Sequence, residues 1–180
     1  MRPHRLLQKA LARRLQFSGA HVDEERHIPE LYDMVWDKTL RKQVPRVALM
    51  DVVASFPGLP APFLIDVSVR SPAAERVATA TVIAGKAAQQ GEKEKWDRYG
   101  PMVRPMVFES LGRAGVHART LIHNLVSTAA SCGLGSPHAS QTYQTTIERA
   151  VVWGAADNVL RARGGQGSSA WTDHLRHAGA

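Results

Sequence analysis

Two apolar, β-branched segments separated by a proline-rich break constrain the fold of this chain more than any other feature. The first runs from Val47 to Phe56 and the second from Phe63 to Arg70. Such residues favour strands, and the intervening Pro57-Gly58-Leu59-Pro60 interrupts regular structure. The two segments therefore predict a hairpin or a closely connected pair of strands.

Each predicted strand carries one aspartate within its apolar run, Asp51 in the first and Asp66 in the second. If the chain reverses near Gly58-Leu59, the numbers of opposed residues sum to about 117, which sets Asp51 across from Asp66 within a residue or so. Such opposed residues lie roughly 5 Å apart between their Cβ atoms. Two carboxylates this close repel each other, and both stay ionised only if a cation lies between them. Oxygen ligands of this kind suit Mg²⁺ or Mn²⁺, with water and substrate phosphate completing the shell. The alternative is that each aspartate is a structural residue at a strand edge.

Helices and further strands are expected around this pair. Periodicity and breakers predict, in order, a helix from Pro3 to about Phe17, a short strand from His21 to Ile28, a helix from Ser71-Pro72 to about Tyr99, a strand from Val103 to Glu109, a helix from about Val116 to Ala130 and a last helix opened by Ser136-Pro137. The stretch from Tyr32 to Pro45 fits no single state. Pro105 suits an edge strand or a bulge. This order indicates an α/β fold with a mixed sheet.

A chain of 180 residues is expected to form one domain with extensions. Residues 1–130 would form the α/β core, and residues 131–163 a helical extension packed on it. In the extension, Ile147, Val151, Ala155 and Val159 recur at four-residue steps. Residues 164–180 are rich in glycine and serine and are expected to form a flexible tail.

The formal net charge of +7 favours an anionic partner, with nucleic acid the first expectation. DNA is the expected partner and RNA the alternative. The predicted first helix would present Arg5, Lys9, Arg13 and Arg14 to phosphates. The four tryptophans are too scattered along the chain to indicate a base-stacking platform.

No run of about 18 apolar residues could span a bilayer, no signal-peptide core is present, and Cys132 has no second cysteine to pair with. These features predict a soluble intracellular protein without a membrane partner.

The helix before Tyr99 could supply a lysine to a metal site. Small residues lead to polar ones along a helical stripe made of Ala84, Ala88, Glu92, Lys95 and Tyr99. Such a stripe would let the helix lie close to the sheet, with Glu92 and Lys95 at its active edge. A lysine there would orient an attacking water or offset charge at a phosphate. The alternative is that Gly91 to Arg98 is a solvated, charged helix end.

Three segments together resemble a known family. They are Met50-Asp51-Val52-Val53, Leu64-Ile65-Asp66-Val67-Ser68-Val69, and an alanine-rich helix ending in Lys95-Trp96-Asp97-Arg98-Tyr99. This succession is similar to the restriction-enzyme-like endonuclease domain of non-LTR retrotransposons and other reverse-transcriptase-bearing elements, within the PD-(D/E)XK superfamily. The resemblance spans roughly Pro3 to Leu125, and Met106 to Arg113 is similar to the family's last core strand.

The resemblance implies roles for individual residues. Asp51 and Asp66 would bind the metal, and Lys95 would be the displaced active-site lysine, with Lys93 as its competitor. Ser68 stands where other branches place a lysine. Glu25, or alternatively Glu24, would help to bind metal, and Glu92 is a further auxiliary candidate. The implied fold is a PD-(D/E)XK core, a mixed sheet flanked by helices, here with extra C-terminal helices.

The resulting hypothesis is a Mg²⁺- or Mn²⁺-dependent endonuclease that hydrolyses DNA phosphodiester bonds. The resemblance also implies a link to a larger reverse-transcriptase polyprotein, and a nuclear location if the element is eukaryotic. The alternative is a non-catalytic, basic nucleic-acid-binding domain that keeps a degenerate nuclease fold. A third reading is a structural fragment of a polyprotein without separate activity.

Overall fold

The computed structural model describes residues 3–72, 83–133 and 145–152. The order of elements is α1 (Pro3–Phe17), β1 (His21–Asp37), β2 (Lys42–Ser55), β3 (Phe63–Arg70), α2 (Lys86–Tyr99), β4 (Val103–Glu109) and α3 (Val116–Ser131), and residues 145–152 are also helical. This sequence of helices and strands confirms the predicted α/β class.

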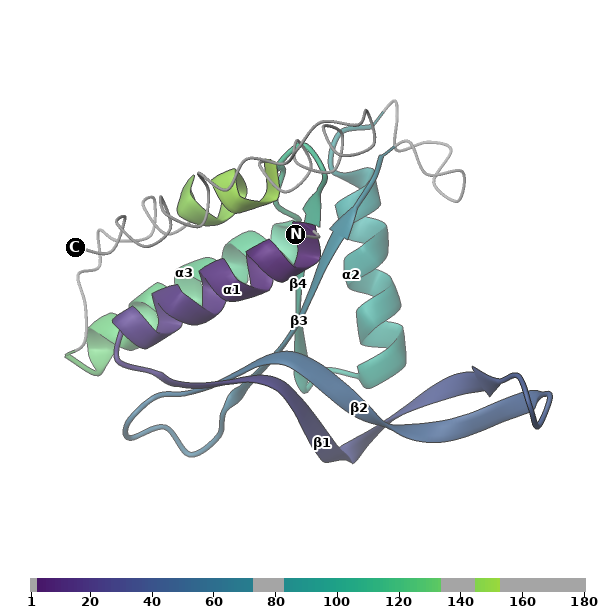
Figure 1. Ribbon diagram of the computed structural model, residues 1–180. Coiled ribbons are helices and arrows are strands. Elements are labelled where there is room, and N and C mark those ends of the chain that lie inside the picture. Colours follow the sequence, from purple (N-terminus) through teal and green to yellow (C-terminus); the bar gives the residue numbers. More distant parts are fainter. Residues whose placement is uncertain (1–2, 73–82, 134–144, 153–180) are drawn as a thin grey trace, which may run out of the picture.

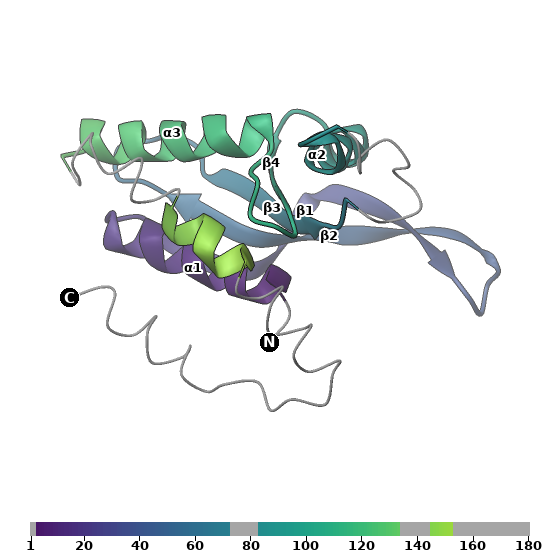
Figure 2. The ribbon, with the colours of Figure 1, turned by 90° about the horizontal axis from the view of Figure 1, so that it is seen from above.

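The sheet has four strands in the order β1-β2-β3-β4. The β1–β2 and β2–β3 pairs are antiparallel, whereas β3 and β4 run parallel through the α2 crossover. The predicted mixed sheet is therefore confirmed, with β4 and its Pro105 at the edge of the described sheet. Figure 2 shows α1 and the helix at 145–152 on one side of β3 and β4, and α2 and α3 on the other.

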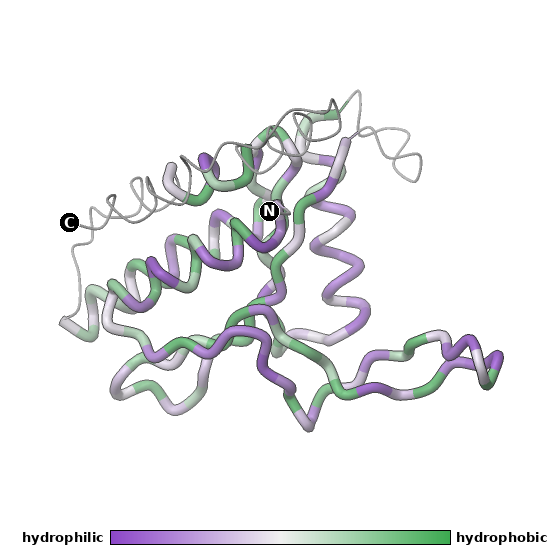
Figure 3. The backbone as a smooth tube through the Cα atoms, in the orientation of Figure 1, coloured by the Kyte–Doolittle hydropathy of each residue, from purple (hydrophilic) through white to green (hydrophobic). Residues whose placement is uncertain are grey.

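Two apolar clusters hold these layers together. The larger joins α1, strands β2, β3 and β4, and α3, with Leu11, Val67, Phe108 and Leu125 among its buried residues. Ile147 of the helix at 145–152 is fully buried in the same cluster. Figure 3 shows that α2, in contrast, is largely hydrophilic, and its close approach to the sheet depends on small residues.

Gly91 is the residue that brings α2 against the sheet. A Cβ at this position would lie 2.9 Å from Val107 Cγ1 and 3.1 Å from Arg70 Nε. These are shorter than normal van der Waals separations, so a larger side chain would push the helix outward. The predicted close packing of this helix is confirmed, and it positions the polar residues of the next turn.

The predicted start of the helix before Tyr99 is wrong. The helix expected from Ser71-Pro72 to Tyr99 begins, in the described part, only at Lys86. Gly85 precedes it with a φ of +86°, a left-handed conformation that ends any continuous helix across this point. Residues 73–82 lie outside the described residues, as do residues 134–144, which include the predicted Ser136-Pro137 helix start, and residues 153–180 with the predicted tail.

The stretch from Tyr32 to Pro45, which had no assignment, belongs to a long hairpin. β1 runs to Asp37 instead of ending near Ile28, and β2 starts at Lys42 instead of Val47. Pairing shifts between Ile28 and Tyr32, and beyond this bulge it continues regularly from Tyr32↔Val47 to Asp37↔Lys42. Figure 1 shows this end of the hairpin as a ribbon that extends away from the helices. We call residues 32–47 the arm.

Candidate active site

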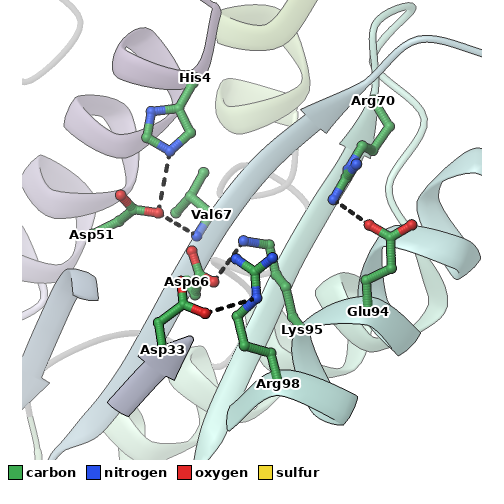
Figure 4. Close-up of polar contacts among 9 residues, drawn as sticks. All are labelled: His4, Asp33, Asp51, Asp66, Val67, Arg70, Glu94, Lys95 and Arg98. Carbon is green, nitrogen blue, oxygen red and sulfur yellow. Dashed lines mark hydrogen bonds and ion pairs between the residues drawn. The ribbon is translucent and has the colours of Figure 1, made fainter. Parts of the chain in front are cut away.

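Asp51 and Asp66 come together where β2 and β3 separate. The observed register pairs Val52 with Ile65 and Val53 with Leu64, so opposed residue numbers follow the predicted sum and the next position outward sets Asp51 against Asp66. The regular pairing of β2 with β3 ends at Val52, and the Val67 N–H donates instead to Asp51 Oδ2 at 2.7 Å. The two side chains are only 15% and 10% exposed. Figure 4 shows both carboxylates at this junction.

Lys95 reaches this carboxylate pair from α2. Its Nζ lies 2.6 Å from Asp66 Oδ2, and its side chain is 11% exposed. Lys93 instead forms an ion pair with Asp97 one turn along the helix, where both side chains are mostly exposed. The structure therefore brings Lys95, and not Lys93, to the aspartates.

Helix α1 holds Asp51 from the other side. His4 Nε2 lies 3.2 Å from Asp51 Oδ2, and Gln8 Nε2 donates to the Asp51 carbonyl oxygen at 3.0 Å. Gln8 is buried although it is polar, because this hydrogen bond satisfies its amide. Sequence reasoning missed both residues. The signal available was their four-residue spacing, which sets them on one face of the predicted helix.

Burial and neighbouring charges shift the pKa values of the two carboxylates in opposite directions. Burial raises the pKa of Asp66 to about 6, with a further increase from the Asp51 carboxyl, while the Lys95 ammonium opposes both. Burial also acts to raise the pKa of Asp51, but hydrogen bonds from His4 and Val67 outweigh it and leave that pKa below its ordinary value. The hydrogen bond to Asp51 in turn raises the pKa of His4. Of these two carboxylates, Asp66 therefore has the less stabilised negative charge and gains more from a further cation.

A second ion pair lies beside the one between Lys95 and Asp66. Arg98 Nε on α2 is 3.4 Å from Asp33 Oδ1 on the arm, and Figure 4 shows this pair next to Asp66 and Lys95. The pKa of Arg98 is raised by the Tyr99 hydroxyl and by Asp33 and Asp66. Asp33 was not among the predicted residues, because it lies in the stretch that had no assigned structure.

Glu25 lies opposite Asp51 without pairing to it. The neighbouring pairs are Glu24↔Val52 and Arg26↔Met50, and Glu25 between them has a φ of +54°. A positive φ at a non-glycine residue interrupts the strand locally. Its side chain is exposed. The structure brings Glu25 to the register position beside Asp51, and Glu24 to the position beside Val52.

Glu92 and Ser68 have other surroundings. Glu92 Oε1 accepts the backbone N–H groups of His117 and Ala118 at 3.0 and 3.1 Å, so it caps the first turn of α3 instead of joining Asp51 and Asp66. Ser68 Oγ is buried, and within the described residues it has no hydrogen-bond partner. The expected auxiliary role of Glu92 at the carboxylates is therefore not supported by its position.

The basic residues of α1 divide into two kinds. Arg5 and Arg13 are exposed, whereas Lys9 and Arg14 are half-buried. Arg14 donates a 3.0 Å hydrogen bond to Thr146 Oγ1 and so helps to attach the helix at 145–152. The predicted basic outer face is narrower than the sequence indicated.

The described residues include no group of three or more His, Cys, Asp and Glu side chains that could hold a metal ion. Mg²⁺, however, is usually bound by one or two carboxylates together with water and substrate phosphate. Asp51 and Asp66 fit that smaller requirement, because they are close together, shielded from solvent and incompletely neutralised.

None of the described helices is both long and apolar enough to cross a lipid bilayer. A comparison with protein-family models finds no match, and a comparison with curated proteins also finds none. The function is therefore inferred from the site's own geometry.

Proposed function

We propose that this chain is a metal-dependent endonuclease that hydrolyses DNA phosphodiester bonds. One observation carries the proposal: Asp51 on β2, Asp66 on β3 and Lys95 on α2 meet in one shielded place, with the Lys95 ammonium 2.6 Å from Asp66. Two carboxylates and a lysine drawn from three separate elements supply the groups needed to bind a divalent cation and a phosphate side by side.

Each residue has a definite task in this reaction. Asp51 and Asp66 would bind Mg²⁺ or Mn²⁺, which when present lowers the pKa of a water and stabilises charge on the phosphodiester. Lys95, which pairs with Asp66, would offer its ammonium to the scissile phosphate or the attacking water. His4 and Gln8 keep Asp51 in position, and Glu25 opposite Asp51 is available as an auxiliary ligand.

The arrangement of elements supports a PD-(D/E)XK type of core. A helix, three antiparallel strands, a crossover helix and a parallel fourth strand follow one another in the order that the sequence resemblance implies. The aspartates occupy the two inner strands, and the lysine occupies the crossover helix. A retroelement origin remains part of the proposal on the sequence resemblance alone.

A second function is favoured by a specific contact pattern. Asp66 already has Lys95 as a cationic partner, and Asp51 already has His4. Such internal pairs would stabilise a nuclease-like fold that only binds nucleic acid. This alternative predicts DNA binding that is independent of divalent metal and no cleavage under any metal condition.

Cleavage of supercoiled plasmid with Mg²⁺ or Mn²⁺ separates the two functions. The unmodified chain is expected to nick the plasmid, and Asp66→Asn and Lys95→Met are each expected to lower the nicking rate at least about a hundredfold. Lys93→Met is the matched control, since it removes a lysine from the same helix that does not contact the aspartates. Its rate should remain within about twofold of the parent.

Circular dichroism and DNA affinity in EDTA must be unchanged in all variants before rates are compared. Equal nicking by the parent and by Asp66→Asn would rule out the proposed site. Metal-independent binding without nicking by any of the proteins would favour the alternative.

A further inference from the structure

The arm is an exposed ribbon with an apolar face. Tyr32, Met34 and Trp36 alternate along β1, so all three point to the same side, and they are 59%, 55% and 59% exposed. Their cross-strand partners Val47, Pro45 and Gln43 share that side. Large side chains of this kind in a row on one surface indicate a contact site for another molecule.

The tip of the arm is basic. Lys38, Arg41 and Lys42 are all exposed, and no carboxylate partner is found for them among the described residues. The nearby Asp37 is already engaged, because its Oδ1 accepts the backbone N–H groups of Thr39 and Leu40 at 2.8 and 2.9 Å. The cations are thus available to an anionic ligand, which argues against a purely apolar partner.

The base of the arm is fixed beside the candidate active site. Asp33 is joined to Arg98, which follows Lys95 by one helical turn. Just before the arm, Leu31 and Ile28 are buried against Met50 and Val53 in the smaller apolar cluster. A ligand held at the base of the arm would therefore lie close to Asp66 and Lys95.

The dimensions of the arm suit a duplex groove. Asp37 lies four residue steps beyond Asp33, which at about 3.4 Å per step gives a reach of roughly 14 Å. The major groove of B-DNA is about 12 Å wide and 8.5 Å deep, and it admits a two-stranded ribbon. Figures 1 and 2 show that the described elements leave the outer half of the ribbon clear on both sides.

We propose that the arm is a DNA-binding ribbon that enters the major groove of a duplex. Tyr32, Met34 and Trp36 contact base edges, while Lys38, Arg41 and Lys42 contact phosphates. This inference deepens the proposed function, since it assumes the same DNA substrate and assigns its binding surface. The arm would hold the duplex so that one phosphodiester lies at Asp66.

Binding to a short fluorescent duplex, measured in EDTA across a series of salt concentrations, tests the arm without any cleavage. The doubly substituted Arg41→Gln/Lys42→Gln chain should bind more weakly and make the slope of log K against log salt shallower by about 1.8, the value for two lost phosphate contacts. The matched control is Lys93→Gln/Arg119→Gln, which removes two exposed cations from α2 and α3. It should keep the parent slope.

A second variant tests the apolar face. Met34→Ser/Trp36→Ser should lower the affinity about tenfold or more with no change in slope, because it removes contacts but no charge. Leu111→Ser, which alters a residue that is 80% exposed and far from the arm in sequence, should bind as the parent does.

The inference about the arm is overturned if both arm variants bind duplex as their controls do. It is also overturned if single-stranded DNA competes better than duplex, or if the apolar variant instead abolishes a concentration-dependent dimer in sedimentation. If the nuclease proposal is wrong, the result differs: the parent does not cleave DNA, but its arm-dependent binding in EDTA persists. Cleavage that requires Asp66, combined with arm variants that bind normally, would reject the arm alone.

Discussion

Asp66 is held in a protein interior that does not favour its charge. The carboxylate is nearly buried, has a second carboxylate as neighbour, and forms an ion pair with the Lys95 ammonium. The pKa of Asp66 is consequently about 6, against an ordinary value of 3.8. A group with such a raised pKa makes folding dependent on pH.

The sign of this dependence follows from the direction of the shift. Because the folded-state pKa is higher than the unfolded-state value, Asp66 stabilises the fold at pH below about 4, and this contribution is lost as pH rises through 6. In EDTA, the free energy of unfolding of the parent should fall relative to that of Asp66→Asn between pH 4 and pH 7, by up to about 3 kcal/mol. Urea denaturation at each pH measures this difference, and parallel curves for the two proteins would contradict it.

At the level of single residues, the opposed positions of Asp51 and Asp66 were predictable from the sequence. The residues that contact them were predictable only in part. The strand register was predictable because the break at Pro57 to Pro60 fixes where the chain reverses. Lys95 could not be separated from Lys93 beforehand, since both lie near the end of one helix and only the packing around Gly91 decides which one faces the sheet. Glu92 was predicted to share the face of Lys95, but it bonds to the start of α3, which no local pattern specifies.

Among the elements, α2 and α3 are joined by an unusually close contact. Glu92 accepts two N–H groups from the first turn of α3, and a Cβ on Gly115 would overlap Glu92 Oε1. Gly115 has a φ of −62°, which any residue can adopt. Its lack of a side chain, and not its backbone conformation, is therefore what this contact requires.

Gly115→Ala should destabilise the protein by roughly 1–3 kcal/mol, because displacing Glu92 leaves buried N–H groups without a partner. Glu92→Gln keeps an acceptor oxygen and should cost less than Gly115→Ala. Chemical denaturation with an unchanged m-value gives the comparison. A Gly115→Ala protein as stable as the parent would show that Glu92 does not cap α3 in solution.

Most elements were predictable, and the arm was not. The helix and strands with one buried face show regular periodicity, so Pro3–Phe17, Phe63–Arg70 and Val103–Glu109 match the predicted bounds. In the arm both faces are largely solvent-exposed, so polar and apolar residues do not sort by burial and the strand pattern is hidden. The tryptophans looked scattered for the same reason. Trp36 shares one face with Tyr32 and Met34 only because β1 continues as a strand to Asp37.

For the molecule as a whole, binding of a divalent cation should appear as added stability. A ligand that binds only the folded state, at a concentration of ten times its Kd, adds about 1.4 kcal/mol to the free energy of unfolding. For a chain of this length that is a Tm increase of roughly 3–6 °C. Mg²⁺ at pH 7.5 should produce this increase in the parent and not in Asp66→Asn. Asp33→Asn, which alters the neighbouring carboxylate paired with Arg98, should respond to Mg²⁺ as the parent does.

Sodium chloride at matched ionic strength controls for general screening in this experiment. A Tm that rises equally in the parent and in Asp66→Asn would place the cation elsewhere. A Tm that does not change in any of the three proteins would argue against a metal at this site and in favour of the binding-only alternative.

His4 and Gln8 make the first helical turns part of the candidate active site, because both hold Asp51. This changes how deletion experiments should be interpreted. A chain shortened past Gln8 would lose Arg5 and also the support of a carboxylate some forty residues away in sequence. Loss of cleavage after such a deletion would therefore not identify a DNA-binding tail. Point substitution of Arg5, with His4 and Gln8 retained, distinguishes a basic recognition surface from a scaffold that positions the reacting groups.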